Sequence, residues 1–236
     1  MLNSSNKMSP ILAVPSVIKL TDVSVNFGDV MALKHINLDI KKGMLLYIIG
    51  PNGSGKTTFI RLLTNLLEPT SGEISISSKH LGYLPQKLNQ NPSFPITVEE
   101  VIYSGFPKQN LIMSKQDGEL IASWLSKMQI GHLRKKPMAK LSGGQQQRIY
   151  LIRALISEPD TIILDEPTSA LDPSFRSYFN DIIMELHHQG KTIIFVTHDL
   201  HDTLCDCAHI AYIDQEIRFF GKYPEYREKE HREHHV

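Results

Sequence analysis

The residues best suited to chemistry in this 236-residue chain lie in the stretch "GPNGSGKTT" at positions 50–58. The stretch matches G-x-x-x-x-G-K-[ST], in which a glycine-rich backbone wraps around phosphates and the next helix turns its positive end toward the anion. Lys56 would add a positive charge between the β- and γ-phosphates of a nucleoside triphosphate, and the Thr57 hydroxyl would ligate Mg²⁺. A chance match is the weaker alternative, because a strand pattern precedes the stretch and a helical pattern follows it. The predicted phosphate-binding residues are Gly50, Pro51, Asn52, Gly53, Ser54, Gly55, Lys56, Thr57 and Thr58.

A second candidate is the acidic pair that ends "TIILDE" at positions 161–166. The apolar residues before the pair predict a buried strand, and adjacent side chains on a strand point to opposite sides. Asp165 would hold the Mg²⁺ shell, while Glu166 would orient or deprotonate the attacking water. Acidic residues often end strands, so the pair gains its meaning from its place about a hundred residues after the phosphate loop.

The stretch "LSGGQQQR" at 141–148 is also shaped to approach a phosphate, but it contains no lysine. Ser142 precedes a helical pattern and would cap that helix. A hydroxyl and backbone N–H groups at a helix N-terminus also bind phosphate charge. The two roles are compatible, and the residues alone leave both open.

The order of patterns along the chain predicts an α/β fold. Alternating residues at 17–49 predict antiparallel strands that lead into one buried strand. Later strands alternate with helices, which is typical of a parallel sheet covered on both faces. A mostly helical insert occupies 87–157, where Thr97 and Glu100 form a capping box. Strands are predicted at 44–50, 73–77, 81–85, 161–166, 192–197 and 209–214. Helices are predicted from Gly55 to before Pro69, over 118–130 and 173–189, and after Asp199.

The composition limits the class of protein. The 25 basic residues balance the 25 acidic ones, so nothing indicates a surface for nucleic acid. The longest apolar runs fall short of the ~20 residues that a membrane-spanning helix needs. The first residues lack the pattern of a secretory signal, which makes the cytoplasm the default compartment. Cys205 and Cys207 are the only cysteines, and we expect two reduced, structural thiols.

The stretch "LSGGQQQRIYLIRAL", followed closely by "TIILDEPTSALD", resembles the ATP-binding-cassette (ABC) family, and the similarity extends over the whole chain. The resemblance implies an ATPase with the P-loop NTPase cassette fold. This α/β fold has a RecA-like parallel-sheet core, an N-terminal antiparallel β subdomain and an inserted helical subdomain. One ABC domain would span 1–236. Its expected parts are the core with the β subdomain at 17–86 and 158–222, the helical subdomain at 87–157, and a charged, histidine-containing tail at 223–236.

The resemblance assigns further roles. Phe27 stands where the family stacks an aromatic residue on adenine, although it could equally belong to the core. Gln86 in "YLPQ" matches a glutamine that contacts metal and water, and His198 in "VTHD" matches a switch histidine at the γ-phosphate. These two residues and Glu166 form the expected catalytic set. Asp172 ends "SALD", which resembles the loop through which two cassettes contact each other.

In the family two cassettes pack head to tail, so the second glycine stretch would bind the ATP held by the partner. The residues concerned are Ser142, Gly143, Gly144 and Gln145. The implied cofactors are ATP and Mg²⁺, with Thr57, Gln86 and Asp165 around the metal. The implied partners are a second copy of the chain, an integral membrane permease docked on the helical subdomain and, through it, an extracytoplasmic solute-binding protein. The ATPase would therefore lie at the cytoplasmic face of the inner membrane.

The segment "PQKLNQNPSFPITVEEVIYSGF" at 85–106 resembles the zinc- and manganese-importing branch of the family, which predicts a divalent metal as cargo. The local alternative is that Thr97 simply caps a helix, and another cargo, such as an iron–siderophore complex, stays open. If the tail is helical, His231 and His235 share one face and could bind metal weakly; otherwise they are solvated.

Two rival classes fit less well. A soluble ABC ATPase of DNA repair or translation would carry coiled-coil arms or a second cassette, and the sequence shows neither. A P-loop kinase that phosphorylates a small molecule would not need the "LSGGQ" stretch.

Overall fold

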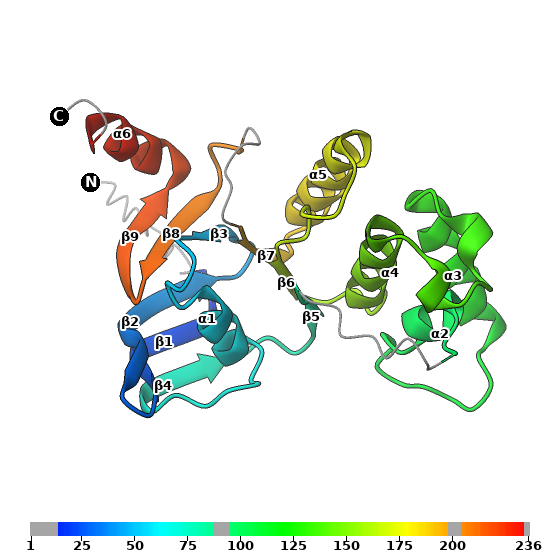
Figure 1. The fold of residues 1–236 in the computed structure, drawn as a ribbon, viewed down its shortest axis with the longest axis horizontal. Coiled ribbons are helices and arrows are strands. Elements are labelled where there is room, and N and C mark those ends of the chain that lie inside the picture. Colours follow the sequence, from blue (N-terminus) through cyan, green and yellow to red (C-terminus); the bar gives the residue numbers. More distant parts are fainter. Residues whose placement is uncertain (1–13, 87–94, 198–203, 234–236) are drawn as a thin grey trace, which may run out of the picture.

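The computed structural model describes residues 14–86, 95–197 and 204–233. Figure 1 shows two sheets side by side and a group of helices, α2 to α4, on the side away from the antiparallel sheet. No helix in these three ranges is long and apolar enough to cross a membrane.

The N-terminal part is a three-stranded antiparallel sheet in the order β2-β1-β4. Ile18, Leu20 and Ile36 on this sheet are almost inaccessible to solvent and pack in one cluster with residues of α1. The predicted antiparallel β subdomain is thereby confirmed. Its strands are β1 (Ser16–Phe27), β2 (Val30–Lys41) and β4 (Ser71–Ile76).

A six-stranded sheet in the order β5-β6-β7-β3-β8-β9 forms the centre. The first five strands are parallel, and their apolar runs are those that the sequence predicts, because such strands are buried on both faces. The antiparallel edge strand β9 escaped prediction because its residues are only partly buried and give a weak pattern. The strands are β3 (Leu45–Ile49), β5 (Leu81–Leu84), β6 (Thr161–Asp165), β7 (Thr192–Val196), β8 (His209–Asp214) and β9 (Glu216–Lys222).

Helices cover both faces of the central sheet, as adjacent residues of β7 show. Ile193 belongs to the cluster that contains Phe179 of α5, whereas Ile194 belongs to the cluster that contains Phe59 of α1. Helix α1 ends earlier than predicted because Asn65 adopts a left-handed φ of 56°. The helices that follow strands of this sheet are α1 (Lys56–Leu63), α5 (Pro173–His188) and α6 (Tyr223–Glu233).

The helices inserted between β5 and β6 begin at side-chain caps. Thr97 and Glu100 form the predicted capping box of α2. Ser114 and Asp117 form another at α3, which therefore begins at Lys115 rather than at residue 118. The elements of this part are α2 (Val98–Tyr103), α3 (Lys115–Lys127), the 3-10 turns Gly131–Leu133 and Met138–Lys140, and α4 (Gly143–Leu155).

The cysteines differ from expectation. The turn at Asp206 brings the Cα atoms of Cys205 and Cys207 to 5.1 Å, and the two residues form a disulfide. This Cα separation lies within the range that a disulfide needs. The prediction of two reduced thiols is therefore wrong for this structure. The helix predicted after Asp199 falls on residues outside the described ranges.

Candidate active site

The loop between β3 and α1 holds its shape because two positions admit only glycine. A Cβ atom at Gly50 would lie 2.0 Å from the carbonyl oxygen of Ile213. At Gly55, where φ is +99°, it would lie 2.5 Å from that of Ala32. The loop therefore presses against neighbouring strands and turns sharply into α1. No side chain caps α1, and its first turn carries no acidic residue. Its first N–H groups can therefore donate hydrogen bonds to an anion.

Lys56 folds back over this loop. Its ammonium nitrogen donates to the carbonyl oxygens of Gly50, at 2.7 Å, and Pro51, at 2.8 Å. Burial lowers the pKa of Lys56 below its ordinary value, while the nearby Glu166 and Asp165 act to raise it. The side chain thus holds the loop together and keeps a positive charge beside the acidic pair.

A cavity of about 320 Å³ lies over the loop and brings together residues from distant parts of the chain. This cavity is lined by predicted site residues that come from β1, the phosphate loop, α1 and the ends of β5 and β6. The lining consists of Phe27, Val30, Met31, Ala32, Asn52, Gly53, Gly55, Lys56, Thr57, Thr58, Gln86, Asp165, Glu166 and Gln215.

The acidic pair departs from the predicted geometry. Asp165 and Glu166 both line the cavity, although adjacent side chains on a strand should point to opposite sides. The reason is that Glu166 lies past the end of β6 in a left-handed conformation with φ 48°. Its N–H donates to the carbonyl oxygen of Val196 at 2.8 Å, which ties the turn to β7.

The two carboxylates have different surroundings. Burial raises the pKa of Asp165 from 3.8 to about 6; the charge of Glu166 adds to this shift, while a backbone hydrogen bond from Gln86 and the charge of Lys56 oppose it. Glu166 is half-buried and accepts a 2.7 Å hydrogen bond from the Gln86 side-chain amide. Oxygen atoms of Thr57, Gln86 and Asp165 are the donors that Mg²⁺ prefers, so the residues present fit this ion.

Phe27 lies at the mouth of the cavity. Its side chain is 48% exposed, and the neighbouring Val30 and Met31 are exposed as well. Phe27 is therefore not a core residue, which removes one of the two readings left open by the sequence. The three side chains form an apolar lip on which a flat ring can lie.

Gln215 lines the cavity, although no sequence pattern pointed to it. Its N–H donates to the Ser54 carbonyl at 2.9 Å, and its own carbonyl accepts from the N–H of Lys34 at 2.7 Å. It thereby joins the phosphate loop to the β2 strand. A single glutamine in a turn between β8 and β9 has no pattern that would reveal this contact.

The second glycine stretch stands apart from the cavity. Ser142 caps α4 by accepting from the N–H of Gln145, and Gln145 bonds back to the Ser142 N–H. Ser142 and Gly143 are exposed, and none of residues 142–145 lines the cavity over the phosphate loop. Within one chain, the two predicted phosphate-binding features do not share a space.

Buried Gln147 connects the two regions, and sequence reasoning missed it. Its amide nitrogen donates to the carbonyl of Glu166 at 3.2 Å, and its amide oxygen accepts from the N–H of Ala170 at 3.1 Å. Asp172, two residues after Ala170, caps α5. It also accepts a hydrogen bond of 2.5 Å from Arg148, which lies on α4. Hydrogen bonds therefore hold helix α4 against the segment that follows the acidic pair.

His198 lies outside the described residues. The strand before it, β7, ends at Val196 beside β3, and the N–H of Thr197 donates to the carbonyl of Ile48 at 3.1 Å. The chain therefore arrives close to the phosphate loop, but the predicted contact of His198 with the γ-phosphate stays a prediction.

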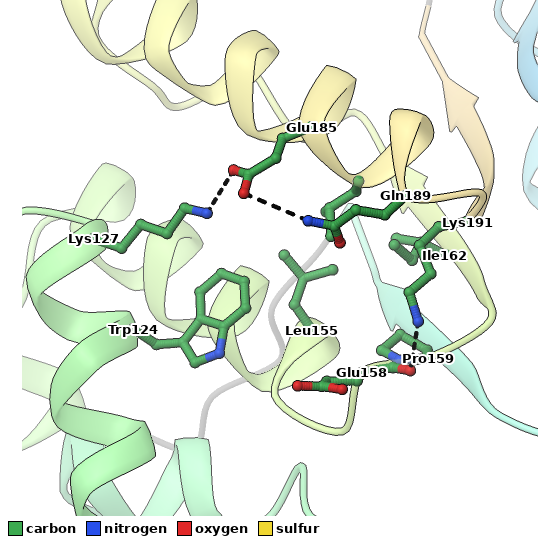
Figure 2. A pocket seen from close by; sticks show the side chains of 10 residues that line it. Trp124, Lys127, Leu155, Glu158, Pro159, Ile162, Glu185, Gln189 and Lys191 are labelled. Carbon is green, nitrogen blue, oxygen red and sulfur yellow. Dashed lines mark hydrogen bonds and ion pairs between the residues drawn. The ribbon is translucent and has the colours of Figure 1, made fainter.

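A second cavity, of about 240 Å³, lies between α3, α4 and α5 and is shown in Figure 2. An ion pair of 2.7 Å between Lys127 and Glu185 crosses it, and Trp124 lies beside the lysine. Lys191 donates to the Glu158 carbonyl at 3.0 Å. This cavity contains none of the predicted site residues and offers no glycine loop for a phosphate.

A comparison with protein families shows to which family the chain belongs. A model described as "ABC transporter" matches residues 33–169, which span the phosphate loop, the "LSGGQ" stretch and the acidic pair. The chain belongs to the ABC transporter family. It is accordingly an ATP-binding ABC ATPase, as the sequence resemblance implied.

Relatives of this ABC ATPase cover most of its length. It is 35% identical to the zinc import ATP-binding protein ZnuC of Photorhabdus laumondii, over 86% of this chain and 76% of the relative. It is 34% identical to the zinc uptake system ATP-binding protein ZurA of Listeria innocua, over 89% of this chain and 88% of the relative. These two relatives confirm the predicted resemblance to the zinc-importing branch of the family.

A solved structure with a TM-score of 0.76 is a dimeric ATP-binding cassette in a post-hydrolysis state, bound to ADP and Pi. It is 28% identical to this ABC ATPase and covers 87% of this chain and 98% of its own. The predicted cassette fold, with a parallel-sheet core and an antiparallel β subdomain, is confirmed.

Proposed function

We propose that two copies of this ABC ATPase pair head to tail, so that each ATP is held between the Lys56 loop of one copy and residues 142–145 of the other. The observation that carries the proposal is that residues 142–145 lie outside the cavity over the phosphate loop, while Ser142 and Gly143 are exposed. The N–H groups at the start of α4 and the neutral hydroxyl of Ser142 would bind a γ-phosphate only while it is present. Hydrolysis then releases the two copies from each other, because the ligand no longer favours the closed state.

Within each site we assign Lys56 and the N-terminus of α1 to the phosphates. Thr57, Gln86 and Asp165 would hold Mg²⁺, which neutralises charge on the phosphates when bound. Glu166 would orient or deprotonate the attacking water, since it lies beside Gln86 and reaches the same cavity. Phe27 would stack on adenine at the mouth, and His198 would contact the γ-phosphate.

The work driven by this cycle is, we propose, import of a divalent metal through a separate membrane permease. Zinc is favoured because relatives at 35% and 34% identity, aligned over most of this chain, carry zinc import and zinc uptake names. The permease would dock on the helical part at 87–157 and hold the ATPase at the cytoplasmic face of the membrane. A solute-binding protein would deliver the metal from the other side.

The shared site is tested with a charge placed at Ser142. Aspartate caps a helix as well as serine does, so Ser142→Asp keeps α4 intact and sets a carboxylate against the γ-phosphate of the partner. In a Glu166→Gln background we expect Mg-ATP to bind the monomer as before but to stop driving dimer formation, measured by light scattering. Ser142→Asn is the matched control, because asparagine also caps a helix well but carries no charge. A Ser142→Asp monomer that loses ATP affinity would place the stretch in its own chain's site.

The cargo is tested in vesicles that contain the ATPase and the permease that copurifies with it. We expect ATP-dependent uptake of zinc, and no uptake with Lys56→Ala. Uptake of manganese or of an iron–siderophore complex in place of zinc would overturn the zinc assignment and leave the ATPase mechanism intact.

A further inference from the structure

The tertiary structure brings a histidine to the cysteine pair, although about twenty positions separate them in the sequence. His187 lies in the last turn of α5, and Cys207 lies in the short loop that leads into β8. The Nε2 atom of His187 is 3.7 Å from the Sγ atom of Cys207. Cys205 is joined to Cys207, so the other sulfur is also at this place.

The distance of 3.7 Å is close to the separation between two ligands of one zinc ion. Zinc binds a thiolate at about 2.3 Å and an imidazole nitrogen at about 2.0–2.1 Å with tetrahedral angles, which puts the two ligand atoms about 3.5 Å apart. Thiolate and imidazole ligands suit zinc and similar divalent transition ions rather than Mg²⁺ or Ca²⁺.

The His187 side chain is prepared for this role. Its Nδ1 atom is buried, so Nε2 is the nitrogen that an ion can reach. Cys207 is exposed to solvent, so an ion has access from outside.

With the disulfide closed, the sulfurs are not thiolates, and the described residues hold no group of three or more metal-binding side chains. We propose that reduction of the Cys205–Cys207 disulfide creates a binding site for a zinc-like divalent ion, formed by Cys205, Cys207 and His187, with water as the fourth ligand. The site lies outside the cavity that holds ATP and does not depend on the cargo of the transporter.

The chemistry balances with a dithiol as reductant. The dithiol transfers two electrons and two protons to the disulfide, which yields two cysteine thiols and the cyclic disulfide of the reductant. Each thiol then gives its proton to solvent as the metal ion binds, so binding releases two protons and becomes weaker as the pH falls.

The test uses Co²⁺ as a spectroscopic probe and Zn²⁺ as its competitor. The full chain is reduced with dithiothreitol, freed of it under argon, and titrated with Co²⁺. Thiolate ligands give a sulfur-to-cobalt charge-transfer band, which sites made only of histidines, including any in the tail, do not give. We expect one equivalent of Co²⁺ with this band, displacement by Zn²⁺, and no band after oxidation with diamide.

Variants assign the ligands. Cys207→Ser replaces an exposed side chain and should lose the band without unfolding. His187→Gln should weaken Co²⁺ binding at least about tenfold. His188→Gln is the matched control, one position along the same helix, and should bind as the unaltered chain does. Absence of the band in the reduced chain, or equal affinity in the His187→Gln and His188→Gln variants, would overturn the proposal.

Discussion

The amide nitrogen of Gln86 lies 2.7 Å from a carboxylate oxygen of Glu166, so two residues that the sequence places eighty positions apart are held together in the folded protein. Gln86 follows strand β5, and Glu166 follows strand β6. This contact joins the residue that we assign to the attacking water to the segment that precedes the helical part of the chain, where we place the permease.

Replacement of Glu166 by glutamine should separate binding from hydrolysis. The amide keeps the shape of the side chain and the hydrogen bond to Gln86, but it cannot take a proton from water. We expect ATP to bind normally while kcat falls by about 10²- to 10⁴-fold, the contribution typical of a general base. Isothermal titration gives the affinity and phosphate release gives the rate. Unimpaired turnover would remove Glu166 from this role.

The two glycines of the "LSGGQ" stretch should behave differently. A Cβ atom at Gly144 would lie 2.7 Å from the carbonyl oxygen of Ala170, so Gly144→Ala should destabilise the fold by about 1–3 kcal/mol. A Cβ atom at Gly143 would meet only the Ala170 side chain, at 3.9 Å, and Gly143→Ala should leave the free energy of unfolding within about 1 kcal/mol.

Urea unfolding measures both glycine variants. ATP-driven dimer formation of Gly143→Ala then reports the added methyl group at the partner's phosphate, free of any folding defect. A stable Gly143→Ala variant that dimerises as well as the unaltered chain would argue against close approach at Gly143.

The raised pKa of Asp165 predicts how the free energy of unfolding depends on pH. The folded-state pKa of about 6 is above the ordinary value of 3.8, so the folded protein binds the extra proton between these values. The charged carboxylate therefore destabilises the free protein above pH 6, and this cost disappears as the pH falls toward 4. Asp165→Asn should stabilise the free protein at pH 7 by about 1–2 kcal/mol, less than the full shift implies, because solvent reaches the cavity.

The Asp165→Asn comparison is made by thermal unfolding at several pH values without nucleotide. The gap between the variant and the unaltered protein should close from pH 6 to pH 4. The variant should also lose Mg²⁺-dependent hydrolysis, since an amide is a poor ligand for this ion. A gap that widens on acidification would contradict the raised pKa.

Gln147 should contribute to both stability and catalysis. Gln147→Met keeps the length of the side chain but leaves the carbonyl of Glu166 and the N–H of Ala170 without this partner. We expect a loss of about 1–3 kcal/mol in the free energy of unfolding and a lower kcat, because the turn that carries Glu166 becomes less constrained. Urea unfolding and steady-state hydrolysis measure the two effects. A variant with unchanged kcat would show that β7 and Ser169 hold the turn without Gln147.

The sequence by itself determined the buried parallel strands, the phosphate loop and the capping box at Thr97. Buried parallel strands such as β6 and β7 are continuous apolar runs, and the loop and capping box are patterns of neighbouring residues, so each carries its signal locally. The sequence also placed Lys56 and Asp165 in one site, because an acidic pair ends a buried strand about a hundred residues after the phosphate loop, and both residues line one cavity.

Only the tertiary structure decided which distant side chains meet. The left-handed turn at Glu166, the contact of Gln215 with the phosphate loop and the approach of Cys207 to His187 depend on packing between segments far apart in the chain. None of these contacts has a sequence period or spacing, since a single residue placed by long-range packing leaves no repeated pattern along the chain.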